Sequence, residues 1–100
     1  MEKRTKTALI TGASSGIGYE LALIHAKNGD NVVLVARSEN KLNELKALIQ
    51  EKFSVNVEVI AMDLAQPESP KQLFDTLEEK KITIEYLINN AGFGDYGKFT

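Results

Sequence analysis

The stretch TGASSGIG (residues 11–18) follows a short apolar run and carries the strongest indication of the fold. Gly12 permits a tight turn, while Gly16 and Gly18 leave room for a phosphate or a strand to approach the backbone. A helix that begins near Ser15 would point its free N–H groups and its positive dipole end at an anion. The stretch predicts a phosphate-binding strand-to-helix turn; a glycine-rich loop that serves packing alone is the alternative.

Apolar runs alternate with amphipathic segments along the rest of the chain. Four runs, residues 7–10, 31–36, 55–61 and 84–88, have the composition of short buried strands. The segments between them keep the 3.6-residue period of helices. Strands that alternate with helices in this way predict an α/β fold, a Rossmann-type parallel sheet with helices on both faces.

Capping signals and apolar faces indicate where the three helices begin and how they pack. Gly29 suits the residue after the first helix, Ser38 suits the N-cap of the second, and Ser69 with Pro70 suits the start of the third. The faces that we expect against the sheet consist of Ile17, Leu21, Ile24 and Asn28, widened by Ala22 and Leu23, in the first helix, Leu42, Leu45, Leu48 and Ile49 in the second, and Leu73, Phe74 and Leu77 in the third.

Composition narrows the class of protein. The 100 residues are 43% hydrophobic and 26% charged, which is ordinary for one globular domain. There is no cysteine, which excludes disulfides, thiolate metal sites and a cysteine nucleophile. A net charge of -2 argues against a general nucleic-acid surface, and no apolar run is long enough for a membrane span. We expect a cytoplasmic protein without a nucleic-acid partner, a membrane segment or a metal site.

Three motifs resemble those of the classical short-chain dehydrogenase/reductase family. The spacing of Gly12, Gly16 and Gly18 departs from the dinucleotide fingerprint G-x-G-x-x-G and resembles the TGxxxGIG motif of that family. The pair Asp63-Leu64 resembles its adenine-binding pair, and residues 89–92 (NNAG) resemble its NNAG motif. The resemblance covers nearly the whole chain. It implies the strand order 3-2-1-4 and one NADP(H)-binding Rossmann half-domain formed by residues 1–100.

The same resemblance implies roles for individual residues. Asp63 would accept a hydrogen bond from the adenine amino group, and Leu64 would offer its backbone N–H to the adenine ring. A capping or turn aspartate is the alternative for Asp63, and strand-end hydrogen bonding is the alternative for Asn89 and Asn90. The implied cofactor-binding residues are Gly12, Ser14, Ser15, Gly16, Ile17, Gly18, Arg37, Ser38, Asp63, Leu64, Asn90, Ala91 and Gly92.

The residues after the second predicted strand favour NADP(H) over NAD(H). A ribose 2′-hydroxyl calls for a carboxylate at this position, whereas a 2′-phosphate calls for a cation. The sequence here is Ala36-Arg37-Ser38, in which Arg37 can bind the phosphate and Ser38 can donate its hydroxyl. A solvated arginine at a helix start is the alternative. Many NADP-preferring relatives also carry a basic residue before the second glycine, where this chain has Ser15.

The catalytic residues that the resemblance leads us to expect are missing. The family uses a serine and a Tyr-x-x-x-Lys pair, and this chain contains no Tyr-x-x-x-Lys. We therefore assign no catalytic residue, and we interpret His25 as a structural or surface residue. We expect a chain truncated before the catalytic half, inactive alone and without a substrate pocket, from an enzyme that interconverts a carbonyl and an alcohol.

Two alternatives remain for the function. One is a non-catalytic nucleotide-binding or assembly module that acts at this length. The other is a methyltransferase-like Rossmann domain, which Ala36-Arg37 disfavours because such domains usually place an acid there to hold a ribose diol. We also expect self-association, because the strand from Ile84 to Ile88 contains no proline or lysine to protect an open sheet edge.

Overall fold

The computed structural model describes residues 5–14 and 16–89 of the chain. Within these residues four parallel strands form one sheet in the order β3-β2-β1-β4, which confirms the predicted strand order. In register, Ala8 of β1 pairs with Val32 of β2 on one side and with Tyr86 of β4 on the other. The strands are β1 (Thr7–Thr11), β2 (Asn31–Ala36), β3 (Val57–Ala61) and β4 (Tyr86–Ile88).

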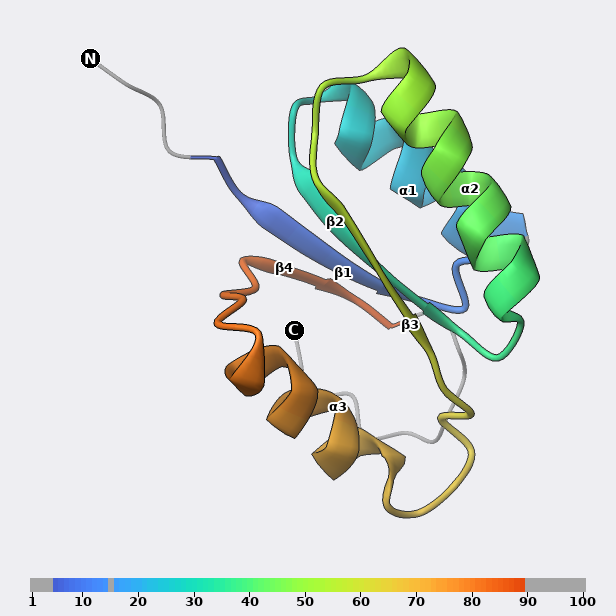
Figure 1. Ribbon diagram of the computed structural model, residues 1–100, viewed down its shortest axis with the longest axis vertical. Helices are drawn as coiled ribbons and strands as arrows, with labels where there is room; N and C mark the ends of the chain where they lie inside the picture. The colour runs from blue at the N-terminus through green and yellow to red at the C-terminus, as the bar shows by residue number, and fades with distance from the viewer. Residues whose placement is uncertain (1–4, 15, 90–100) are drawn as a thin grey trace.

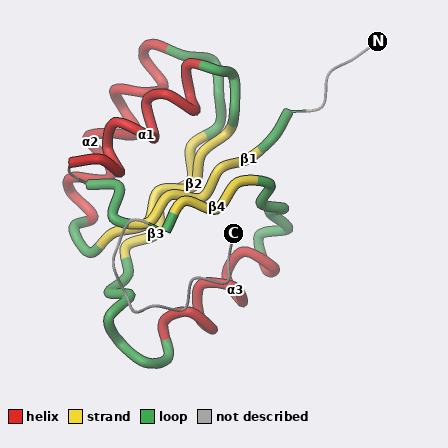
Figure 2. Tube along the Cα trace, turned by 180° about the vertical axis from the view of Figure 1, so that it is seen from behind, coloured by secondary structure: helices red, strands yellow, loops and turns green. Residues whose placement is uncertain are grey.

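Helices cover both faces of the sheet, as predicted. The helices α1 (Gly16–Lys27) and α2 (Glu39–Lys52) lie side by side on one face, and α3 (Ser69–Glu79) lies on the other (Figure 1). The view from behind shows the same three layers, with the sheet between the helices (Figure 2). Because the four strands are parallel, the loops that follow them lie at one edge of the sheet.

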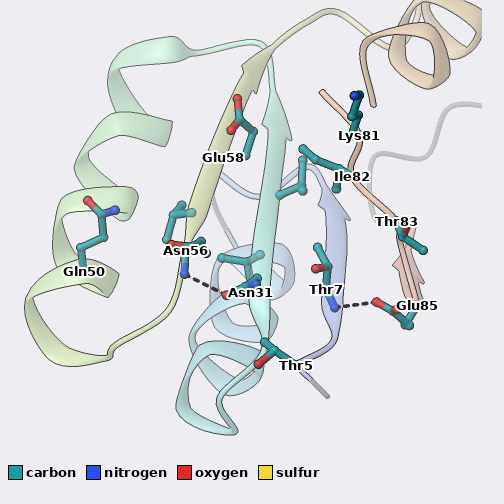
Figure 3. Close-up of a pocket in the computed structure, with 13 residues that line it drawn as sticks. Thr5, Thr7, Asn31, Gln50, Asn56, Glu58, Lys81, Ile82, Thr83 and Glu85 are labelled. Carbon is teal, nitrogen blue, oxygen red and sulfur yellow. Dashed lines mark hydrogen bonds between the residues drawn. The ribbon is translucent and has the colours of Figure 1, made fainter. Parts of the chain in front are cut away.

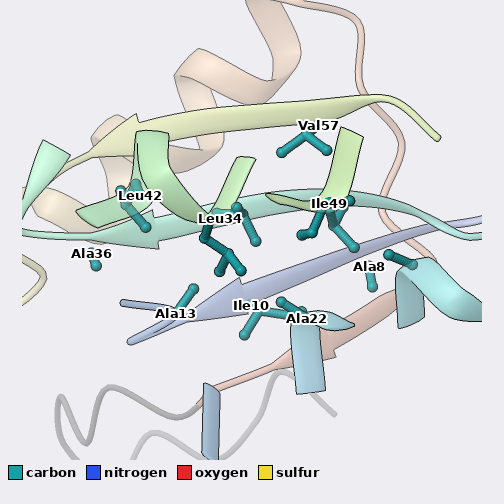
Figure 4. Close-up of a cluster of buried hydrophobic side chains, with 12 residues drawn as sticks. Ala8, Ile10, Ala13, Ala22, Leu34, Ala36, Leu42, Ile49 and Val57 are labelled. Carbon is teal, nitrogen blue, oxygen red and sulfur yellow. The ribbon is translucent and has the colours of Figure 1, made fainter. Parts of the chain in front are cut away.

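The larger core lies between the sheet and the pair α1 and α2 (Figure 4). Alternate residues of the central strands, including Ile10 and Leu34, point into it and are fully buried. Leu42, Leu45 and Ile49 of α2 cover them, as the sequence predicted. Both faces of β2 are covered by helices, which explains why every residue from Val32 to Ala36 is apolar and buried.

The predicted packing face of α1 is wrong for Ile17 and Ile24, whereas Ala22 is buried and Leu23 packs against the core as predicted. The residues of α1 that the structure buries are Gly18, Ala22 and Ala26, whereas Ile17 is 67% exposed and Ile24 is 52% exposed. Small residues at this spacing let the helix backbone lie close to the sheet, and Ile17 and Ile24 on the other side of the helix then turn outward. Close approach of the helix backbone to the sheet therefore determines which side of α1 is buried, and the size of the apolar side chains does not.

A second core lies between the sheet and α3. Leu73 and Leu77 of α3 pack there against Leu9, Val33 and Val35, which lie on the face of the central strands that is turned away from α1 and α2. The expectation for Phe74 is wrong, because the residue is 47% exposed and lines the hollow between α3 and β4 instead of packing in this core. The two cores together place the sheet in the middle of the fold.

The outer strands are shorter than predicted, for a reason visible in their pairing. β2 begins at Asn31, and Val32 pairs with Val57, so Val55 extends beyond the end of the neighbouring strand. At β4, the N–H of Thr7 donates to the side-chain Oε1 of Glu85 at 2.8 Å instead of to a strand carbonyl. The N–H of Glu85 still donates to the carbonyl of Thr7 at 2.9 Å, so a backbone bond continues to Glu85 although the regular ladder begins only at the pair Ala8 and Tyr86.

Candidate nucleotide-binding site at the carboxyl ends of the strands

The predicted phosphate-binding stretch occupies the turn between β1 and α1. Gly12 has a φ of 65° and Gly16 a φ of 61°, in the left-handed region that favours glycine. Gly18 lies one turn into α1 and is buried against the sheet. These positions confirm a tight strand-to-helix turn at the start of a helix, which is the geometry that suits an anion. Ser14 is half-buried in the turn, and Ser15 lies outside the described residues.

Hydrogen bonds tie this turn to the neighbouring strands. The N–H of Ala13 donates to the carbonyl of Val35 at 3.2 Å, and the Ala13 side chain is fully buried. The buried Oγ1 of Thr11 lies 3.4 Å from the carbonyl oxygen of Ile88 and 3.2 Å from Oδ1 of Asn89. The ends of β1, β2 and β4 are thereby held together. Asn89 makes the strand-end contact that was predicted for it.

The end of β2 presents Arg37 and Ser38. The Arg37 side chain is exposed and forms no ion pair with another described residue. Ser38 is the N-cap of α2, as predicted, and its Oγ accepts from the N–H of Lys41 at 3.3 Å. The hydroxyl proton of Ser38 can still be donated to a ligand. A cation and a hydroxyl donor therefore stand next to each other after β2.

The end of β3 carries Asp63 in a turn that its own side chain helps to form. Oδ1 of Asp63 accepts from the N–H of Ala65 at 2.9 Å, and the Met62 N–H donates to the Ala36 carbonyl at 2.8 Å. The turn role considered for Asp63 is thus present. Among the described residues, Oδ2 of Asp63 then has only a long contact, 3.5 Å, to Nε2 of Gln66. Leu64 follows with its side chain buried.

The capping role expected of Ser69 is wrong. Glu68 is the N-cap of α3 and makes no side-chain capping bond, while Ser69 is the first residue of the helix. The Ser69 hydroxyl instead donates to the carbonyl of Asp63 at 2.6 Å. Sequence patterns did not indicate this bond or the one made by Thr11. Thr11 follows the buried Ile10, which was the available signal for it, whereas Ser69 lies between the exposed Glu68 and the half-buried Pro70 and offered none.

The structure thus brings the predicted residues of three strand ends to one edge of the sheet. Gly12, Arg37 and Asp63 follow β1, β2 and β3, and Asn89 follows β4. Ligands of parallel α/β sheets bind beyond the carboxyl ends of the strands, because the loops there differ and the helix N-termini point outward. The remaining predicted residues, Asn90, Ala91 and Gly92, lie outside the described residues.

A hollow at the opposite edge of the sheet contains none of the predicted residues (Figure 3). Its volume is about 560 Å³, and polar side chains at the amino ends of the strands line it. Two of them satisfy backbone groups there: Oδ1 of Asn31 accepts from the N–H of Asn56 at 2.9 Å, and Glu85 accepts from Thr7. These side chains serve the ends of the strands, and we assign no ligand to them.

His25 has structural contacts, as interpreted from the sequence. Its Nδ1 lies 2.9 Å from Oδ2 of Asp30, and its ring centroid lies 5.3 Å from that of Tyr86. Among residues 5–14 and 16–89 there is no cluster of three or more His, Cys, Asp or Glu residues that could hold a metal ion. No helix within that part of the chain is long and apolar enough to cross a membrane.

The motifs and the topology agree with a comparison to known families. The family model of the short chain dehydrogenases matches residues 6–100. The chain belongs to this family. This chain is 40% identical to an 11-beta-hydroxysteroid dehydrogenase of Pinus massoniana over 89 residues, which are 89% of this chain and 25% of that protein. It is 42% identical to a very-long-chain 3-oxoacyl-CoA reductase of Scheffersomyces stipitis over 92 residues, 90% of this chain and 26% of that protein.

Solved structures give the same relation. L-sorbose reductase from Gluconobacter frateurii, complexed with NADPH and L-sorbose, superposes with a TM-score of 0.82 at 41% identity, over 91% of this chain and 35% of that one. A short-chain dehydrogenase from Sphingobium yanoikuyae in complex with NADPH superposes with a TM-score of 0.78 at 42% identity, over 87% of this chain and 34% of that one. The chain spans about a quarter of the length of the curated relatives it matches.

Proposed function

We propose that residues 1–100 are the NADP(H)-binding half-domain of a short-chain oxidoreductase that interconverts a carbonyl and an alcohol. The observation that carries this proposal is the meeting of the Gly12–Gly16 turn, Arg37 and Asp63 at the carboxyl edge of one parallel sheet. The pyrophosphate of the cofactor would lie over the turn and the start of α1, where backbone N–H groups and the helix dipole favour an anion.

The residues after β2 support NADP(H) as the cofactor. Arg37 is exposed and has no ion pair among the described residues, so its guanidinium can bind a 2′-phosphate through two charge-assisted hydrogen bonds. Ser38, beside it, can donate its hydroxyl. Two of the solved relatives contain NADPH. The adenine ring of the cofactor would contact Asp63 through its amino group and the backbone N–H of Leu64 through a ring nitrogen.

The nicotinamide cofactor would supply the hydride, and a side chain would have to supply the proton. Neither tyrosine in the described part of the chain is placed for this. Tyr19 packs against the core on the α1 and α2 face, and Tyr86 contacts His25 at the last turn of α1. No tyrosine in the sequence is followed four residues later by a lysine that would lower its pKa. We therefore propose that this chain binds the cofactor and does not turn over by itself.

Calorimetry and an activity assay test the proposal together. The chain should bind NADPH more tightly than NADH, and it should not oxidise NADPH with a panel of ketones and aldehydes. A folded chain that binds neither cofactor at millimolar concentration would refute the binding role. Loss of a proton donor lowers the rate of catalysis by roughly 10²- to 10⁴-fold, so we expect no measurable turnover. Turnover that disappears when a residue of this chain is substituted would refute the proposed inactivity.

Self-association through β4 is also part of the proposal. Within the described residues no strand pairs with the outer edge of β4. Between β4 and α3 lies a hollow of about 360 Å³ with apolar side chains, among them Leu73, Leu77 and Leu87. An open edge beside apolar surface favours pairing with another strand, and a two-fold dimer with antiparallel β4 strands is the simplest closed arrangement. The cytoplasmic location expected from the sequence stays a prediction.

A further inference from the structure

The hydroxyl of Ser69 is buried beside the turn that would contact adenine. Ser69 is 3% exposed, and its Oγ donates to the carbonyl oxygen of Asp63 at 2.6 Å. The Ser69 N–H donates to the carbonyl of Gln66 at 3.1 Å, so backbone and side chain both close this turn. A hydroxyl at the start of a helix usually caps the helix. This one points back to Asp63, two residues after the end of β3.

The carbonyl that Ser69 holds belongs to the same peptide unit as the N–H of Leu64. That unit is planar and trans, so its C=O and N–H point in opposite directions. Fixing the carbonyl of Asp63 therefore fixes the direction of the Leu64 N–H. A hydrogen bond to the carbonyl also polarises the unit and makes its N–H a stronger donor.

The Leu64 N–H is available for a ligand. Its side chain is 6% exposed and packs with Leu73 and Leu77 of α3, which anchors the residue from the other side. Within residues 5–14 and 16–89 the Leu64 N–H has no hydrogen-bond partner. A rigid, polarised donor at the edge of the candidate site therefore stands next to the Asp63 carboxylate.

We propose that Ser69 is a positioning residue for adenine recognition, which acts through the Asp63–Leu64 peptide unit and does not touch the cofactor. The inference rests on the proposed function. Adenine offers an unprotonated ring nitrogen beside an amino group, so it can accept from the Leu64 N–H and donate to Asp63. Hypoxanthine reverses both, because its ring nitrogen carries a proton and its exocyclic group is a carbonyl. Ser69 should therefore matter for adenine and not for hypoxanthine.

Calorimetry with two nucleotides separates positioning from a general structural role. Ser69→Ala should weaken NADPH binding by about threefold to tenfold, the usual effect of losing one neutral hydrogen bond. Binding of reduced nicotinamide hypoxanthine dinucleotide phosphate should change by less than about twofold, because hypoxanthine cannot accept a hydrogen bond from the Leu64 N–H and has none to lose. The matched control is Thr76→Ala, which removes a hydroxyl-to-carbonyl bond of 2.9 Å to Gln72 on the same helix, away from the site. Ser69→Thr, which keeps the hydroxyl, should restore NADPH binding.

An experiment without nucleotide tests the same coupling independently. In ¹H–¹⁵N spectra of the free chain, Ser69→Ala should move the Leu64 amide resonance, and Thr76→Ala should leave it in place. If Ser69→Ala does not fold, Ser69→Cys replaces it, because the thiol has a similar shape and is a weaker donor.

Equal losses for both nucleotides would overturn the inference, as would a Leu64 amide that does not respond to Ser69. If the folded wild-type chain binds neither nucleotide, the proposed function fails and adenine positioning fails with it. In that case a response of the Leu64 amide would show that the peptide coupling exists without a cofactor role, so the two failures are distinguishable.

Discussion

Replacing Gly16 by alanine separates the backbone role of the glycine turn from its proposed contact with a cofactor. Gly16 has a φ of 61°, and apart from its chain neighbours and the backbone of its own helix, a Cβ built on it meets no atom of the described residues within 4 Å. Gly29, after α1, is a matched control, because its φ is 90° and a Cβ there also meets nothing within 4 Å. Only Gly16 lies at the candidate site.

The expected loss of stability follows from the backbone alone. An L-residue in the left-handed region costs about 1–2 kcal/mol, and alanine recovers roughly 0.4–1 kcal/mol by restricting the unfolded chain. Both Gly16→Ala and Gly29→Ala should therefore lower the free energy of unfolding by about 1 kcal/mol. Urea titration followed by circular dichroism measures this difference.

The expected effect on binding differs between the two variants. The methyl group of Gly16→Ala would occupy space that the pyrophosphate needs, so NADPH affinity should fall by about tenfold or more, which corresponds to about 1.4 kcal/mol. Gly29→Ala should leave the affinity unchanged. The empty surroundings of the Gly16 Cβ make the comparison sharp, because the methyl disturbs no protein neighbour. Equal affinities for the two variants, measured by calorimetry, would refute the assignment of the pyrophosphate to this turn.

Three further predictions concern cofactor choice, assembly and packing. Arg37→Ala should weaken NADPH binding by about 1.5–3 kcal/mol and leave NADH binding nearly unchanged in calorimetry, and equal losses would mean that Arg37 does not read the phosphate. Leu87→Lys or Tyr86→Pro should shift the population toward monomer or unfolded chain, as measured by sedimentation. A wild-type chain that is a folded monomer at tens of micromolar would contradict the β4 interface. Leu34→Ala should cost about 2–5 kcal/mol in urea unfolding, whereas Ile24→Ala should change little, and similar costs would contradict the observed packing of α1.

Local patterns in the sequence were enough to predict the order of strands and helices and the edge of the sheet at which the candidate site residues lie. β2 was predicted with its observed bounds, because a strand covered by helices on both faces must be apolar throughout. The tight turn at Gly12 was predicted because glycine adopts the left-handed region without strain. Gly16 was expected only to leave room for a close approach, and its φ of 61° came from the structure. Arg37 and Asp63 were placed correctly because parallel strands put their carboxyl ends at one edge.

Only the tertiary structure decided which face of α1 is buried. The sequence of α1 offers two apolar faces, one with Ile17 and Ile24 and one with Ala22 and Ala26, and side-chain hydrophobicity favours the first. The distance between the helix and the sheet, which no local pattern contains, selects the small residues.

The hydrogen bonds that hold the site together also depended on the tertiary structure. Thr11 meets Asn89 across 78 positions of the chain, and Ser69 reaches back to Asp63 across a turn. Ser69, between Glu68 and Pro70, gives no sign in the sequence that it is buried. Thr11 follows a buried strand residue, where a hydroxyl needs a partner because an unsatisfied buried polar group is costly. Which carbonyl satisfies it depends on how the strand ends and α3 are brought together, and that is decided only when the layers pack.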